Sequence, residues 1–187
     1  MMTSVKKFII YTDGSSTTFH DKTGLKYGGI GVFFGDNSNY NISKSYKGRN
    51  VTNQRMELQA CISGIKKCIE IVDKKQLWEL TIYTDSMYTI NCINEWAKKW
   101  ILWGWKRKIG KQYKEIKNLD LIKELYKLSK LYSIKYIHRK AHQSEPSKDN
   151  KIIWKTWYGN KMADKLAGDA MAKSKTLSLY TEQEHKN

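Results

Sequence analysis

Two carboxylates stand directly after apolar, β-branched runs of the sequence. Asp13 ends the run in KFIIYTDGSS, and Asp85 ends a run of the same pattern in LTIYTDSMY. A single Asp-Gly pair is an ordinary turn and requires no chemical role. Two strands that end in Thr-Asp followed by Gly or Ser instead predict neighbouring carboxylates on one rim of one sheet.

Two further acids stand early in predicted helices. Glu57 lies within NQRMELQA and Asp164 within GNKMADKLAG. Either could simply complement the positive N-terminal end of its helix. The four acids together would repel one another unless a cation neutralised them. Oxygen ligands without Cys or His spacing suit Mg²⁺ or Mn²⁺, and two such ions about 4 Å apart can promote phosphodiester hydrolysis.

The charge of the chain indicates its class of partner. The 187 residues include 34 Lys and Arg against 18 Asp and Glu, a formal net charge of +16. This excess points to a polyanion such as nucleic acid. A membrane surface is the rival partner, but neither terminus has the basic amphipathic helix that it would require. No apolar run reaches membrane-spanning length, and none has the pattern of a signal peptide. A basic protein with an acidic, metal-binding pit is typical of a nuclease.

The cysteines indicate a redox compartment. Cys61, Cys68 and Cys92 are odd in number and lack metal-ligand spacing. We expect buried, reduced thiols, and therefore an intracellular, reducing compartment rather than secretion.

Hydrophobic periodicity predicts the elements that must position the acids. Strand-like runs cover 7–12, 29–34, 40–46, 80–84 and 133–138. Helical spacing covers 53–72, 86–96, 119–132 and 161–173, with Thr52 or Asn53 as the cap of the first helix. This order predicts one α/β domain, residues 1–173, with helices on a central sheet, followed by a polar and flexible tail, residues 174–187.

Four segments carry a resemblance to a known family. IIYTDGS, TNQRMEL, IYTDSMYTI and GNKMADKLA, in this order, resemble the four acidic motifs of the cellular, type-one ribonuclease H family. The resemblance implies the ribonuclease H-like fold, a five-stranded mixed sheet with helices on both faces. It also implies two Mg²⁺ ions, with Mn²⁺ as a substitute, and hydrolysis of the RNA strand of an RNA–DNA hybrid to 3′-hydroxyl and 5′-phosphate ends. The implied catalytic metal ligands are Asp13, Glu57, Asp85 and Asp164.

The resemblance also suggests a proton carrier. His142 lies in HRKAHQSEPS, where the family has a Gly-His pair, and a histidine near neutral pKa can pass protons or help product to leave. Here Ala141 replaces the glycine, and extra residues that include DNKIIWKTW separate His142 from Asp164. His138 closes the preceding strand, so we expect a structural role for it.

Residues 96–117 interleave cations with aromatic rings. The segment holds eight Lys or Arg, one Glu and four Trp. Some of these rings could be core, but lysines beside aromatic faces suit phosphates beside sugars or bases. The segment coincides with the basic protrusion by which ribonuclease H enzymes grip the DNA strand. We expect its cations to bind nucleic acid, namely Lys98, Lys99, Lys106, Arg107 and Lys108.

Further nucleic-acid contacts follow from the resemblance alone. Asn53 and Gln54 match positions that contact ribose hydroxyls, the group that distinguishes RNA from DNA. Thr52 and Asn118 match a pocket for a DNA phosphate, although Arg49 is shifted by one residue from the basic position of that pocket. The residues expected to line the DNA channel are Tyr88, Trp96 and Trp100.

Three rival interpretations remain open. A related nuclease or resolvase could act on DNA, a basic binding module could use the acids only as helix caps, or the chain could be a domain of a reverse transcriptase. The Asn53–Gln54 pair and the tryptophan-rich segment favour a hybrid-specific enzyme. We expect a stand-alone monomer without an N-terminal hybrid-binding module.

Overall fold

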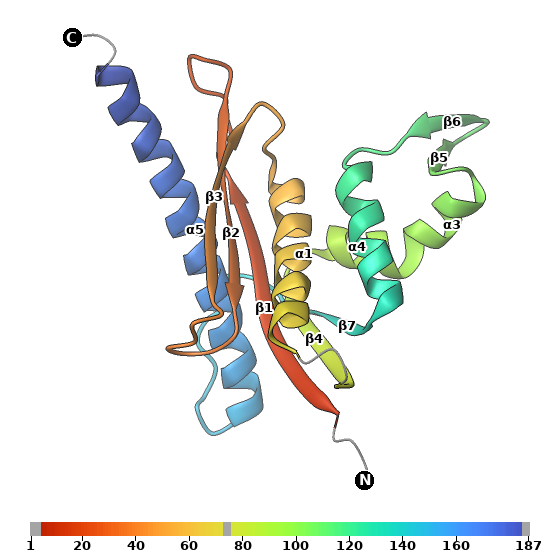
Figure 1. The fold of residues 1–187 in the computed structure, drawn as a ribbon, viewed down its shortest axis with the longest axis vertical. Helices are drawn as coiled ribbons and strands as arrows, with labels where there is room; N and C mark the ends of the chain where they lie inside the picture. Colours follow the sequence, from red (N-terminus) through yellow and green to blue (C-terminus); the bar gives the residue numbers. More distant parts are fainter. Residues whose placement is uncertain (1–4, 73–75, 185–187) are drawn as a thin grey trace.

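A five-stranded sheet forms the centre of the protein (Figure 1). The computed structural model describes residues 5–72 and 76–184. The strand order is β3-β2-β1-β4-β7, with β2 antiparallel to its neighbours β1 and β3, and β4 parallel to β1 and β7. The expected five-stranded mixed sheet is therefore confirmed. Its strands are β1 (Lys6–Ser16), β2 (Lys26–Phe33), β3 (Ile42–Gly48), β4 (Trp78–Thr84) and β7 (Ser133–His138).

Helices cover both faces of this sheet, as expected. The helix α1 lies on one face with α4 packed outside it, and α5 lies on the other face (Figure 1). A short helical run connects β4 to a separate two-stranded hairpin, β5–β6. The remaining elements are α1 (Asn53–Ile71), α2 (Met87–Asn91), the π-helical segment η1 (Cys92–Trp96), α3 (Ala97–Leu102), β5 (Lys106–Ile109), β6 (Gln112–Glu115), α4 (Leu119–Leu131) and α5 (Lys151–Glu184).

The main core lies between the sheet and α1. Ile10 and Ile82 of the sheet pack with Leu58 and Ile62 of α1, all fully buried. The three cysteines are buried here without disulfides, as the sequence predicted. Thr52 caps α1, since its side chain accepts a hydrogen bond from the Arg55 backbone N–H. No helix among the described residues is long and apolar enough to cross a membrane.

Two glycines let helices approach the sheet closely. A Cβ on Gly14 of β1 would lie 2.2 Å from the backbone nitrogen of Glu57 in α1. A Cβ on Gly31 of β2 would lie 2.0 Å from the carbonyl oxygen of Ala163 in α5. Real Cβ atoms cannot approach backbone this closely. Both helices can therefore take these positions only because glycine stands at the contact.

The last helix differs most from the sequence prediction. It begins at Lys151 rather than 161, because Asn150 Oδ1 caps it through the backbone N–H of Ile153 at 3.1 Å. It also passes the predicted domain end at residue 173 and continues to Glu184. Ser174 is buried and donates a hydrogen bond to the carbonyl oxygen of Tyr46, so the boundary placed at residue 173 falls inside a packed helix.

Three smaller differences concern the bounds of elements and one added hairpin. The predicted helix 86–96 continues through η1 and α3 to Leu102. The predicted strand 40–46 lies two residues later, at Ile42–Gly48. The hairpin β5–β6 was not predicted, because its eight strand residues are all exposed and show no alternation of apolar and polar positions.

Candidate active site

Strand pairing brings the first two carboxylates together. In the parallel pair of β1 and β4, Thr12 lies beside Thr84. Asp13 and Asp85 follow these two threonines directly, so they lie at adjacent positions on one rim of the sheet. The two carboxylates are neighbours, as the sequence predicted, but Asp13 does not end its strand, because β1 continues to Ser16 in its pairing with β2.

The helix α1 delivers Glu57 to the same place. Glu57 lies in the second turn of α1 and is only 6% exposed. The close approach at Gly14 sets its backbone against β1. One carboxylate oxygen from each of Asp13, Glu57 and Asp85 lies within 4.8 Å of the others. Three segments far apart in the sequence therefore contribute to one acidic cluster.

The electrostatics of the cluster favour neutralisation. Burial raises the pKa of Asp13 from 3.8 to about 8, and the charges of Asp85 and Asp164 act in the same direction. Burial and the charges of Asp13 and Asp85 raise the pKa of Glu57 well above its ordinary value. Burial likewise raises the pKa of Asp85. Binding of a proton or a cation would therefore stabilise the cluster.

The donor set fits a hard divalent cation. Glu57 Oε2 and Asp85 Oδ1 are buried without a hydrogen-bond partner among the described residues. Buried carboxylate oxygens without partners are costly unless a ligand satisfies them. Grouped carboxylates with no Cys or His between them match the oxygen ligands of Mg²⁺ or Mn²⁺.

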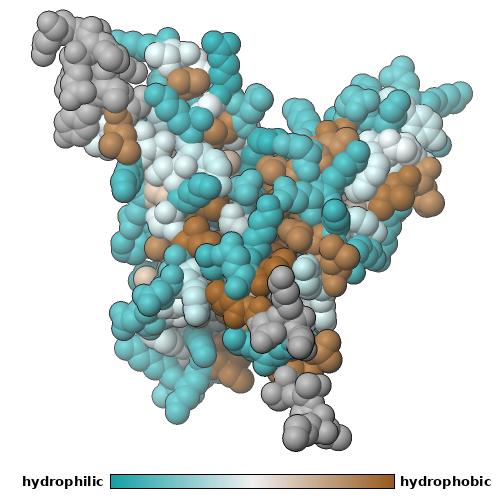
Figure 2. Space-filling view, viewed as in Figure 1, coloured by the Kyte–Doolittle hydropathy of each residue, from teal (hydrophilic) through white to brown (hydrophobic). Residues whose placement is uncertain are grey.

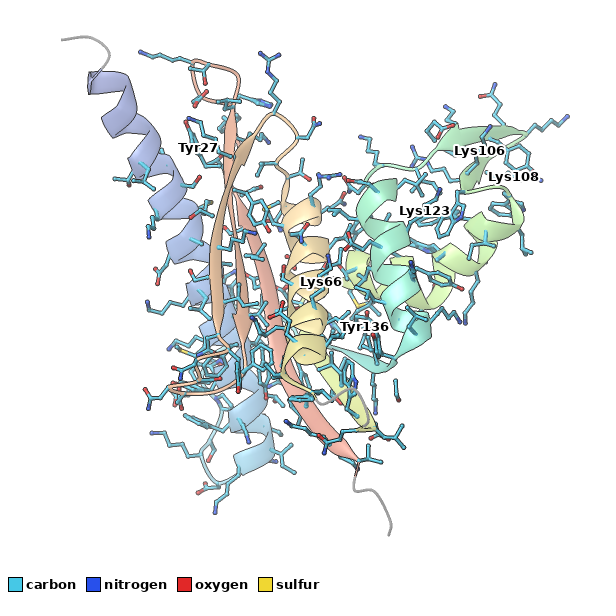
Figure 3. All side chains as sticks on the ribbon, in the orientation of Figure 1. Tyr27, Lys66, Lys106, Lys108, Lys123 and Tyr136 are labelled. Carbon is cyan, nitrogen blue, oxygen red and sulfur yellow. The ribbon has the colours of Figure 1, made fainter. Side chains whose placement is uncertain are left out.

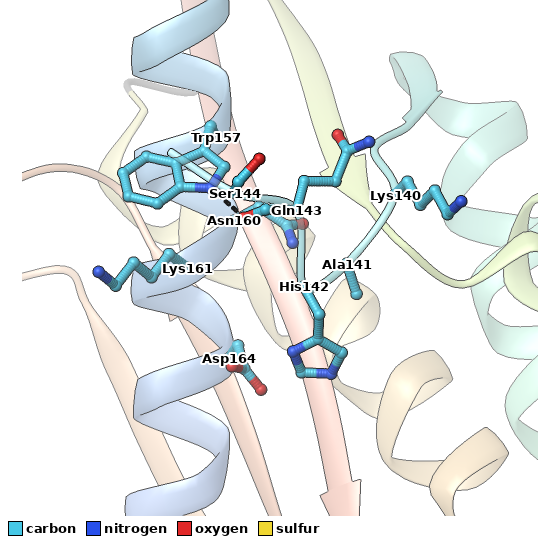
Figure 4. A pocket seen from close by; sticks show the side chains of 9 residues that line it. All are labelled: Lys140, Ala141, His142, Gln143, Ser144, Trp157, Asn160, Lys161 and Asp164. Atoms are coloured by element: carbon cyan, nitrogen blue, oxygen red, sulfur yellow. Dashed lines mark hydrogen bonds between the residues drawn. The ribbon is translucent and has the colours of Figure 1, made fainter. Parts of the chain in front are cut away.

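Asp164 and His142 face each other across a pocket of about 370 Å³ (Figure 4). Asp164 projects from α5, and its charge raises the pKa of Asp85. His142 lies in the loop after β7, and its charge opposes that rise in the pKa of Asp85. Its backbone has φ = 50°, a conformation that residues other than glycine seldom adopt. The structure thus places both residues beside the acidic cluster.

Three pocket residues contribute features that the spacing of the acids did not indicate. Asn160, one turn before Asp164, is 8% exposed, and its Oδ1 has no hydrogen-bond partner in the described part of the chain. Trp157 Nε1 donates to the carbonyl oxygen of Gln143 at 2.8 Å and ties the His142 loop to α5 (Figure 4). The sequence signal for Asn160 was its place four residues before Asp164, where the resemblance has an Asn, and Trp157 had no signal because the predicted helix began at residue 161.

The N-terminus of α1 presents the residues expected to contact ribose. Asn53 and Gln54 are exposed. The Asn53 side-chain amide donates to Glu57 Oε1 at 3.3 Å, so Asn53 links the surface to the acidic cluster. Thr52 is exposed but uses its side chain as the helix cap.

Tyr88 and Asn118 form one polar contact. Asn118 Nδ2 donates to the Tyr88 hydroxyl at 3.2 Å, and Asn118 has left-handed backbone, with φ = 60°. Trp96 lies edge-on to Tyr88, with ring centroids 6.1 Å apart, and is half-buried. Trp100 is only 9% exposed and belongs to the main core, so its ring supports Trp96 and offers little surface to a ligand.

The basic segment 96–117 stands away from the sheet. The elements α3, β5 and β6 project beside α4, and hydrophilic side chains cover much of this lobe (Figures 1 and 2). Lys106 and Lys108 lie on the hairpin at its outer end (Figure 3). All five predicted phosphate contacts are exposed, on α3 or β5, namely Lys98, Lys99, Lys106, Arg107 and Lys108.

Comparison with known proteins gives a consistent result. The RNase H family model matches residues 5–172. A ribonuclease H of Caldicellulosiruptor saccharolyticus is 35% identical over 144 residues, which cover 75% of this chain and 88% of the relative. Human ribonuclease H1 is 31% identical over 166 residues, which cover 89% of this chain but only 50% of the relative.

Solved structures show the same fold. LC9-RNase H1, described as a type 1 RNase H with the type 2 active-site motif, matches with a TM-score of 0.62 and 21% identity, over 91% of this chain and 74% of that one. LC11-RNase H1 in complex with an RNA/DNA hybrid matches with a TM-score of 0.55 and 19% identity, over 89% of this chain and 98% of that one.

Proposed function

The chain belongs to the ribonuclease H family of metal-dependent nucleases, and from this premise we propose that it hydrolyses the RNA strand of RNA–DNA hybrids with two bound Mg²⁺ ions. The products are a 3′-hydroxyl and a 5′-phosphate. The observation that supports this proposal best is the cluster of buried Asp13 and Glu57 with half-buried Asp85, in a protein with a net charge of +16. A basic surface attracts the polyanion, and the acidic cluster retains the cations that act on it.

Four carboxylates would hold the ions: Asp13, Glu57, Asp85 and Asp164. When bound, the ions supply an activated water and stabilise the leaving oxygen. The rim of the sheet and the closely packed α1 fix three of the carboxylates before any ion binds. Asp164 is exposed on the pocket wall, so it completes the site from the solvent side.

His142 would move a proton at the edge of this site. It lies in a loop, across the pocket from Asp164. A histidine that titrates near neutral pH can accept or donate a proton during strand cleavage. The strained backbone at His142 and the bond from Trp157 to the loop hold the imidazole on the pocket side.

The remaining residues would hold and recognise the hybrid. Asn53 and Gln54 would sense the 2′-hydroxyls of the RNA strand. Thr52, Asn118 and Tyr88 would contact the DNA strand, and the lobe at 96–117 would bind its phosphates. The catalytic unit would include α5 at least as far as Ser174, which is buried and hydrogen-bonds to Tyr46 of β3.

A cleavage assay with matched variants tests the proposal. The parent should cut a hybrid in Mg²⁺ and leave double-stranded RNA and double-stranded DNA intact, with no cleavage in EDTA. Asp13→Asn and Asp85→Asn should abolish cleavage while hybrid binding is retained. The control is Asp169→Asn, which removes an exposed α5 carboxylate paired with Lys165 and should cut at the parental rate. Cleavage of double-stranded DNA by the parent would assign the protein to the rival DNA nucleases.

A further inference from the structure

A second cavity, of about 760 Å³, lies apart from the active-site pocket. It is formed by the first half of β1, the end of β2 with the loop that follows, and the segment around the start of α5. The two cavities have no lining residue in common. Its volume is within the range of about 300–1,000 Å³ that is usual for ligand sites.

One wall of this second cavity is aromatic. Trp154 and Tyr158 of α5 stack with ring centroids 5.0 Å apart and planes 9° apart. Tyr158 meets Phe33 edge-on at 6.0 Å. Trp154 Nε1 donates to Glu145 Oε1 at 2.9 Å, which fixes the orientation of the indole. The wall is therefore built in advance of any ligand, from residues of the segment that separates His142 from Asp164.

The rim of the same cavity is positively charged. Four lysines and one acid line it, which leaves a formal charge of +3. The acid, Asp36, accepts a hydrogen bond from the hydroxyl of Tyr158 at 2.8 Å. Three of the lysines make no ion pair with any described residue, namely Lys148, Lys151 and Lys155.

The cavity is connected to the active site along α5. Trp154 contacts Trp157, with ring centroids 6.4 Å apart, and Trp157 lines the pocket that contains His142. Asp164 follows Tyr158 by six positions, which is about 9 Å along a helix at 1.5 Å per residue. A strand held at Asp164 could therefore reach the aromatic wall within a few nucleotides.

We propose that this second cavity binds a single-stranded nucleic acid, with a base against the Trp154–Tyr158 wall and its phosphates on the lysine rim. Aromatic faces and cations together match the two parts of a nucleotide. An apolar peptide would leave the lysines without partners. The site goes beyond the proposed cleavage, since it would hold a strand that leaves the hybrid near Asp164.

Binding measurements in EDTA test the proposal without any cleavage. The probe is a fluorescent twelve-residue oligothymidylate, and the variant is Lys148→Gln, Lys151→Gln and Lys155→Gln combined. All three side chains are exposed, so the fold should persist. We expect at least a fivefold loss of affinity and a fall of about one to two in the slope of log K against log salt, at about 0.7 per lost phosphate contact. The matched control changes the same number of exposed lysines on the loop after β1 and on the distal part of α5, namely Lys22, Lys173 and Lys175, and should bind as the parent does.

Two further arms identify the ligand. Trp154→Ala should weaken oligothymidylate binding at least fivefold while circular dichroism stays parental, because stacking on the wall is lost. Hybrids with a single-stranded extension should bind the parent more tightly than blunt hybrids, and the triple lysine variant should lose this preference. Equal affinity of the triple lysine variant and the control for oligothymidylate would overturn the proposal. Binding of thymidine monophosphate as tight as that of the oligomer would overturn the assignment to a strand.

Discussion

Asp13→Asn should stabilise the metal-free protein at neutral pH although it removes a catalytic ligand. Burial, with the charges of Asp85 and Asp164, raises the pKa of Asp13 from 3.8 to about 8. The folded state therefore binds a proton that the unfolded state releases between these two values. Because the folded state binds more protons, its stability falls as the pH rises from about 4 to about 8. Asparagine does not titrate, so the variant should not lose stability over this pH range.

The size of the effect follows from the same shift. About three pH units separate 3.8 from pH 7, and each unit corresponds to about 1.4 kcal/mol. Protonation of Asp13 in the folded state thus costs the metal-free protein about 4 kcal/mol of stability at pH 7. The amide also loses hydration on burial, so we expect a net stabilisation by Asp13→Asn of about 2–4 kcal/mol at pH 7. At pH 4 the two proteins should differ little.

Urea denaturation in EDTA, followed by tryptophan fluorescence, measures this difference at several pH values. Addition of Mg²⁺ should reverse the order, since an ion that binds only the folded parent stabilises it by mass action. Asp21→Asn is a control for which we expect the opposite change, a loss of stability at neutral pH. Hydrogen bonds from Thr23 and Tyr27 lower the pKa of Asp21 well below its usual range, so that carboxylate stabilises the fold above about pH 4. If Asp13→Asn destabilised the metal-free protein equally at pH 4 and pH 7, the account of a carboxyl group whose pKa is raised by burial and by neighbouring charges would be wrong.

Three further outcomes are expected. His142→Ala should lower the single-turnover rate by up to about 100-fold, less than loss of a metal ligand, because water can replace a proton carrier; a variant as inactive as Asp13→Asn would require another role for the imidazole. Gly31→Ala should destabilise the protein by about 1–3 kcal/mol in urea, because its Cβ would force β2 from α5; an unchanged midpoint would contradict this contact. Changing the five exposed cations of the basic lobe to Gln should reduce the slope of log K against log salt for hybrid binding by about two to three. The single-turnover rate at saturating hybrid should stay close to that of the parent. An unchanged slope would mean that these cations are only solvated surface. The five are Lys98, Lys99, Lys106, Arg107 and Lys108.

The sequence alone determined the acidic cluster and the elements that present it. Apolar runs that end in Thr-Asp predicted Asp13 and Asp85 side by side, because parallel strands expose their carboxyl ends on one rim. The spacing from Leu58 to Ile69 predicted one buried face for α1, and its cap was narrowed to Thr52 or Asn53, of which the structure selects Thr52. These features are local in the chain, or follow from the strand period, so they can be seen without the tertiary structure.

The tertiary structure decided how closely the acids meet and what surrounds them. The roles of Gly14 and Gly31 depend on the helix that crosses each glycine, which no local pattern records. The early start of α5 places Tyr158 against Phe33, a residue more than a hundred positions away. Such contacts are non-local, and the local helix preference of a segment does not reveal them. The second cavity lies where the start of α5 meets β1 and the end of β2.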